Sequence, residues 1–127
     1  MVMPDAPQLV ARFVTDEQGK PRYAQPGTGR KHYRIVVEVE NAPSDVVAAT
    51  FELDPSYYLP VRTVERAADG RVKLETHAYG DYALKVDLRS KSGVTPVSTT
   101  LRKALLCGES RNLDPKIAAA IAEIADN

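Results

Sequence analysis

Residues 82–89 alternate between apolar side chains and small or charged ones, which is the clearest pattern in the chain. Successive side chains of a β-strand point to opposite faces, so this alternation predicts a strand with one face in a core. It recurs in residues 32–40, in residues 71–76, and in residues 46–53, where Val47, Ala49, Phe51 and Leu53 share one face. The chain is therefore constrained to β-structure in which several short strands each bury one face.

Weaker strand candidates lie at residues 9–14, 62–65 and 94–106, the last interrupted at Pro96. We expect the segments 32–40 and 46–53 to pair with each other, and Asp69-Gly70 to form a hairpin turn, because both residues tolerate a positive φ. Six or seven strands spaced about ten residues apart are typical of a two-sheet sandwich. The predicted fold class is all-β: an immunoglobulin-like antiparallel β-sandwich with a short C-terminal helix.

The sequence changes character after residue 112. Asp114 is a good N-cap residue, Pro115 suits the first helical position, and isoleucines recur at helical spacing among alanines. We expect this isoleucine stripe, formed by Ile117, Ile121 and Ile124, to pack on the edge of the sandwich. The alternative is a linker or partner-binding helix. The chain then divides into a sandwich over residues 1–112 and a helical segment over residues 113–127.

Charge and composition exclude several classes of partner. The 127 residues include 17 basic and 17 acidic ones, so the chain has no overall attraction for a phosphate backbone or an anionic membrane, and nucleic-acid binding is not expected. No apolar run approaches the roughly 20 residues that span a bilayer. One cysteine and the absence of a basic-then-apolar leader over residues 1–10 predict a cytoplasmic protein.

Residues suited to catalysis or metal binding are few. His32 and His77 are the two histidines, and neither has the spacing of a zinc motif. Cys107, the single cysteine, follows two leucines and is expected to be a buried small hydrophobe. The sequence therefore predicts no enzyme, no metal site and no cofactor.

A small basic cluster lies just before the strand at residues 32–40. Residues 26–31 lack the spacing of a phosphate-binding loop, and no helix pattern follows them. Arg30, Lys31 and Arg34 are interpreted as the solvated flank of a loop, since one cluster in a neutral chain offers few phosphate contacts.

Four of the six tyrosines lie in two short segments: Tyr57 and Tyr58, then Tyr79 and Tyr82. Adjacent aromatic loops at one end of a sandwich can form a narrow binding slot, because a phenol ring brings a large and stiff apolar face. The residues alone leave two interpretations open. The rings either line such a slot or are core tyrosines that hold corners through their hydroxyls.

Two blocks of sequence around these tyrosines resemble the YEATS domain family, and more closely its prokaryotic branch. That family carries F-x-L-H-x-S-F followed by P-x-R, and then E-x-x-G-[WY]-G-E-F. The corresponding residues here are Phe51-Glu52-Leu53-Asp54-Pro55-Ser56-Tyr57, Pro60-Val61-Arg62 and Glu75-Thr76-His77-Ala78-Tyr79-Gly80-Asp81-Tyr82. The similarity covers residues 33–88. The family fold is an immunoglobulin-like sandwich, and its eukaryotic members read acylated lysine.

The resemblance implies a ligand site as well as a fold. Tyr57 and Tyr79 would be the two aromatic faces around a flat acyl amide, and Ser56 would supply a hydroxyl. The turn from Ala78 to Gly80 would offer backbone N–H groups. A planar neutral amide tolerates such a desolvated slot better than a charged ammonium does.

The chain also departs from the family pattern. Asp54 stands where the family usually has a histidine, and Ala78 replaces a glycine. Asp54 and His77 complete the set of residues that we expect to contact the ligand.

The sequence therefore predicts a non-enzymatic recognition module. Its expected ligand is an acylated lysine in a protein or peptide, or a small acyl-bearing molecule, bound on behalf of an effector domain in a longer protein. The alternative is a structural or protein-interaction sandwich with core tyrosines and a C-terminal helix that docks a partner.

Overall fold

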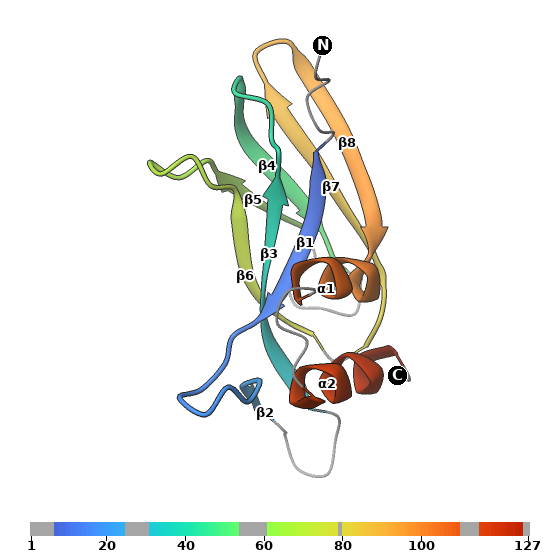
Figure 1. Cartoon of the computed structure of the whole chain (residues 1–127). Helices are drawn as coiled ribbons and strands as arrows, with labels where there is room; N and C mark the ends of the chain where they lie inside the picture. Colours follow the sequence, from blue (N-terminus) through green and yellow to red (C-terminus); the bar gives the residue numbers. More distant parts are fainter. Residues whose placement is uncertain (1–6, 25–30, 54–60, 79, 110–114, 126–127) are drawn as a thin grey trace, which may run out of the picture.

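A computed structural model describes residues 7–24, 31–53, 61–78, 80–109 and 115–125, which form two four-stranded antiparallel sheets and two helices (Figure 1). The first sheet consists of β1 (Gln8–Phe13), β2 (Tyr23–Ala24), β3 (His32–Glu40) and β6 (Lys73–Ala78). The second consists of β4 (Val46–Glu52), β5 (Val61–Glu65), β7 (Ala83–Ser90) and β8 (Gly93–Thr100). The helices are α1 (Leu101–Glu109) and α2 (Pro115–Ala125). The predicted all-β sandwich is confirmed, with one more helix than expected.

β3 is the centre of the first sheet. β6 pairs with residues 33–38 of β3, so β1 and β2 share the opposite edge. The prediction that β3 pairs with β4 is wrong, because both edges of β3 are occupied and β4 lies between β5 and β7 in the second sheet. Asn41, at a positive φ of 59°, begins the turn that carries the chain from one sheet to the other.

The core lies between the sheets and follows the alternation read from the sequence. Ile35, Phe51 and Leu84 are fully buried and come from strands of both sheets. One residue breaks the predicted pattern: Val47 is 55% exposed. The β4–β7 register shifts between Val46 and Ala48. This irregularity places Val46 in the core instead and turns Val47 outward.

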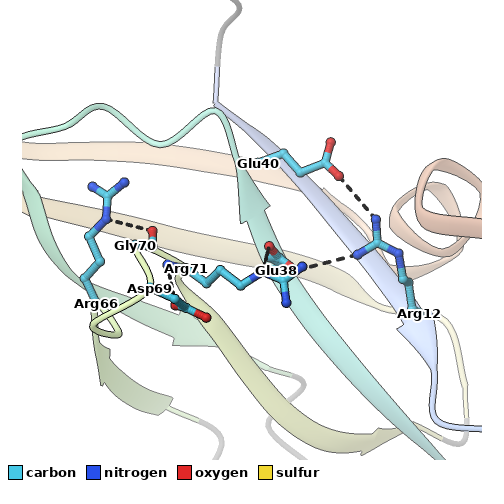
Figure 2. A network of polar contacts seen from close by, with 7 residues as sticks. All are labelled: Arg12, Glu38, Glu40, Arg66, Asp69, Gly70 and Arg71. Atoms are coloured by element: carbon cyan, nitrogen blue, oxygen red, sulfur yellow. Dashed lines mark hydrogen bonds and ion pairs between the residues drawn. The ribbon is translucent and has the colours of Figure 1, made fainter.

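Asp69-Gly70 forms a tight turn, with Gly70 at a φ of 85°. The Asp69 carboxylate accepts a 3.0 Å hydrogen bond from the backbone N–H of Arg71, and Arg66 Nε donates to the carbonyl of Gly70 at 2.8 Å (Figure 2). The prediction of a hairpin is wrong, since β5 belongs to the second sheet and β6 to the first. The turn is a connection between the two layers.

The strand expected over residues 94–106 ends at Thr100, where α1 begins. Leu101, Ala104 and Leu105 are buried at helical spacing. The Asp81 carboxylate accepts a 3.0 Å hydrogen bond from the N–H of Arg102, which satisfies a donor that the first helical turn leaves free. Because this acceptor comes from a distant turn, local sequence did not reveal it. Pro96 lies within β8, on the sheet edge where a missing N–H is tolerated.

α1 packs against β1 (Figure 1). A Cβ atom on Gly108 would overlap the carbonyl oxygen of Ala11, so glycine allows the close approach. The buried Glu109 accepts a 2.9 Å hydrogen bond from the N–H of Phe13. Cys107 is exposed and accepts a hydrogen bond from the side chain of Gln8 at the start of β1. The expectation of a buried thiol is wrong, because the face that α1 buries is carried by Leu101, Ala104 and Leu105.

α2 closes the end of the sandwich at which β3 begins (Figure 1). Its isoleucine stripe is buried within the main core, as expected for a helix that packs on its own domain. Asp114, the proposed N-cap, lies outside the described residues. Neither described helix is long and apolar enough to span a membrane. The division at residue 112 remains a prediction.

Candidate functional site

The two tyrosine segments are flanked by strand ends that meet at one end of the sandwich. Glu52, the last residue of β4, pairs with Lys85 near the start of β7. Ala78, the last residue of β6, pairs with Tyr33 near the start of β3. The chain then passes from β6 to β7 within a few residues. The described residues before and after both segments are therefore at the same end.

The predicted ligand-binding residues fall into two groups. Asp54, Ser56, Tyr57 and Tyr79 lie outside the described residues. His77, Ala78 and Gly80 are described and adjoin position 79 in the chain: the side chain of His77 is exposed, whereas Ala78 and Gly80 are buried. The ligand-binding role of all seven residues remains a prediction.

Tyr82 and Asp81 have structural roles in this region. Tyr82 is 8% exposed and belongs to the main core, so the ring of this one of the four tyrosines is a core side chain. Its carbonyl accepts a 2.9 Å hydrogen bond from the N–H of Leu101, and Asp81 caps the same helix. The end of the second YEATS-like block is therefore tied to the start of α1.

His77 projects from the outer face of the first sheet, directly opposite Arg34 on β3. Partial burial of the imidazole lowers the pKa of His77 below its ordinary value. The positive charges of Arg34, His32 and Arg62 lower it further, and the carboxylate of Glu75 acts in the opposite direction. The imidazole therefore lies in locally positive surroundings.

An open groove of about 660 Å³ lies beside His77. Six of its lining residues carry polar or charged groups: Asp16, Lys20, Arg22, Tyr23, Arg34 and His77. Sequence reasoning noted Arg34 as a solvated loop flank and His77 as a slot neighbour, and it missed the others. The alternation predicts that Arg34 and His77 point outward. It does not predict that they lie opposite each other on neighbouring strands.

Hydrogen bonds hold the groove wall in shape. The Asp16 carboxylate accepts from the backbone N–H groups of Gln18 and Lys20 at 2.9 and 3.0 Å. The hydrogen bond from Lys20 is the main cause that lowers the pKa of Asp16. Arg22 is fixed through its backbone, since its N–H donates to Val14 at 2.8 Å and its carbonyl accepts from Arg34 at 2.9 Å.

Among the described residues, no group of three or more His, Cys, Asp or Glu side chains is arranged to hold a metal ion.

Residues 32–98 match the family described as the prokaryotic YEATS domain. The match spans more than half of the 127 residues. The chain belongs to the prokaryotic YEATS domain family. The search of curated proteins gave no match.

The YEATS match begins at β3 and ends within β8, so it includes both tyrosine segments. β1, β2, α1 and α2 lie outside it. Within the groove, Arg34 and His77 belong to the YEATS match, whereas Asp16, Lys20, Arg22 and Tyr23 precede it. The groove is therefore lined partly by β3 and β6, which the match covers, and partly by residues 16–24, which it does not.

Proposed function

We propose that this chain is a non-enzymatic reader module that binds an acylated lysine, or a similar small acyl-bearing group, between Tyr57 and Tyr79. The observation that carries the proposal is the YEATS family match, because it includes both tyrosine segments. The strand ends around these segments support it, since they lie at the same end of the sandwich. YEATS domains are reader modules for acylated lysine peptides, and this chain has tyrosines at the corresponding positions.

The chemistry of the slot follows from the loss of charge on acylation. A neutral planar amide loses less hydration than an ammonium group on entering a site between two rings. Stacking on two aromatic faces contributes roughly 1 to 3 kcal/mol beyond the buried area. Ser56 and the backbone from Ala78 to Gly80 would meet the polar atoms of the amide.

The partner is proposed to be a cytoplasmic protein or peptide that carries the modified lysine, read on behalf of an effector domain. One side chain buries little area, so the dissociation constant is expected to be on the order of micromolar or weaker. Asp54 would place a negative charge at the mouth of the slot.

Titration by NMR tests the proposal. The ligands are free acetyl-, propionyl-, butyryl- and crotonyl-lysine, with unmodified lysine as the control. Saturable shifts of Ser56, Tyr57 and Tyr79 resonances with an acyl-lysine and none with lysine would support the slot. An absence of shifts with every ligand at millimolar concentration would refute acyl-lysine recognition.

The second candidate, a sandwich that docks a partner through its C-terminal helix, has less support. The isoleucine stripe that would make such a contact is buried in the core of this chain. A partner would have to bind the polar face of α2 instead.

A further inference from the structure

The outer face of the first sheet differs in charge between its two ends. At the end where β3 finishes, Glu38 lies 3.6 Å from Arg12 and 3.5 Å from Arg71 (Figure 2). Arg12 also contacts Glu40 at 3.3 Å. Acids and bases alternate in this cluster, so its charges largely offset one another.

At the end where β3 begins, basic side chains lie in one row. Arg34 is directly opposite His77 on β6, and on its other side its N–H donates to the backbone of Arg22. All three side chains line the groove. Within the described part of the chain, no carboxylate lies within 4.0 Å of a charged nitrogen of Arg22 or Arg34. We call these three residues the basic row.

The acidic groups near the basic row offset its charge only in part. Asp16 uses a carboxylate oxygen for two backbone N–H groups of its own turn, and it acts on Lys20 and Arg22 only at longer range. Glu75 lies on the same strand as His77 and acts on it only at longer range. Lys20 adds a further cation to the groove wall. Arg22 and Arg34 lie opposite each other in the sheet, and like charges placed in this way are unfavourable, so an anion in the groove would relieve the repulsion between them.

We infer that the basic row binds the carboxylate side chains of an acidic peptide segment next to the acylated lysine. The inference rests on the proposed function for the position of that lysine, since His77 is two residues from Tyr79 in the chain. Arginine presents a planar fork of donors that suits a carboxylate. Neighbouring strands lie roughly 5 Å apart, and side chains two residues apart on one face of an extended peptide are roughly 7 Å apart, a difference that long arginine side chains can span.

The shape of the basic surface favours a peptide over a nucleic acid. The row is short, because Glu75 and the balanced cluster around Glu38 follow it along the same face. A nucleic acid binds through several successive phosphate contacts, and this surface offers few.

Fluorescence anisotropy with labelled peptides tests the inference. One set carries an acetyl-lysine flanked by two Glu, two Gln or two Lys residues, and a matched set carries unmodified lysine. At low salt, Glu flanks are expected to tighten binding roughly tenfold relative to Gln flanks, and added salt is expected to reduce this difference. Equal binding of Glu- and Gln-flanked peptides would overturn the inference.

Two variants locate the effect. Arg34→Gln is expected to remove the preference for Glu flanks. Lys73→Gln removes one exposed cation from the face of β6 that carries His77, outside the groove. This variant is expected to keep the preference for Glu flanks. A preference that survives Arg34→Gln would contradict the inference. Thermal unfolding checks that both variants fold, and Arg22→Gln replaces Arg34→Gln if the latter does not.

The unmodified peptides separate the inference from the proposed function. If acetylation does not change the affinity but Glu flanks still tighten binding in a way that depends on Arg34, acyl-lysine recognition is refuted and the role of the basic row is supported. If acetylation tightens binding but Glu and Gln flanks give equal affinity, the role of the basic row is refuted and acyl-lysine recognition is supported. A single-stranded oligonucleotide of equal charge that binds more tightly than the Glu-flanked peptide, and loses binding in Arg34→Gln, would show that the groove serves nucleic acid instead.

Discussion

The hydroxyl of Tyr33 donates a 2.7 Å hydrogen bond to the carboxylate of Glu123, which joins β3 to α2 across 90 residues of sequence. The Tyr33 ring is buried and packs edge-on against Phe13 at a centroid distance of 5.4 Å. Burial raises the pKa of Tyr33, and the hydrogen bond to Glu123 raises it further. α2 is therefore held by a polar contact as well as by its isoleucine stripe.

Tyr33→Phe is expected to lower the free energy of unfolding by about 1 kcal/mol, because it removes this hydrogen bond and keeps the ring packing. Urea denaturation measures the change. Tyr23→Phe is the matched control, since the Tyr23 side chain is 51% exposed and its replacement should leave stability nearly unchanged. Equal stability of Tyr33→Phe and the parent chain would mean that the contact with Glu123 contributes nothing.

Gly108→Ala is expected to destabilise the protein by roughly 1 to 3 kcal/mol, because the added Cβ would overlap the Ala11 carbonyl and force α1 away from β1. In an exposed helix the same change would stabilise the protein by about 1 kcal/mol. The sign of the change in the free energy of unfolding therefore shows whether α1 approaches β1 closely at Gly108. Thermal or urea unfolding gives that sign. Lys103→Ala, at an exposed position of the same helix, should change stability by less than about 0.5 kcal/mol.

Asp81→Ala is expected to cost about 1 kcal/mol of stability, because the N–H of Arg102 loses its acceptor at the start of α1. Asp81→Asn keeps an acceptor oxygen and should retain most of that stability. Chemical denaturation of the two variants makes the comparison. Equal losses for Ala and Asn would show that the charge of Asp81, rather than its hydrogen bond, is what matters.

The pKa of His77 is expected to lie below the ordinary histidine value of about 6.5. The unfolded chain then binds this proton more tightly than the folded chain, so the contribution of His77 to stability is complete above pH of about 6.5 and is lost as the pH falls through the folded pKa. An NMR titration of the imidazole measures the shift. Arg34→Gln removes one of its causes and should raise the pKa of His77, whereas Lys73→Gln should not.

Tyr79→Ala is expected to abolish binding of the best acyl-lysine while the thermal midpoint stays close to that of the parent chain. Tyr79→Phe keeps the aromatic face and should retain most of the affinity. Calorimetric titration and thermal unfolding test the pair. A large loss of stability in Tyr79→Ala would instead favour a core tyrosine.

The alternation of apolar residues identified β3, β6 and β7 and most of their buried faces, because side-chain direction in a strand depends on neighbouring residues alone. The isoleucine stripe of α2 was readable for the same reason. Within the candidate site, the residue types and their order along the chain were sufficient to recognise the YEATS family, and residues 32–98 bear this out. That His77 adjoins a ligand slot stays a prediction.

Sequence by itself thus determined the class of structure, the family and the inward face of most strands. Tertiary structure decided which strands pair: β3 and β4 share a strong pattern yet lie in different sheets. It also decided that residues 101–109 form a helix, capped by Asp81 from another turn, and that Arg22, Arg34 and His77 form one row. The physical reason is that pairing, capping and charge clustering depend on contacts between residues far apart in sequence, whereas side-chain alternation is local.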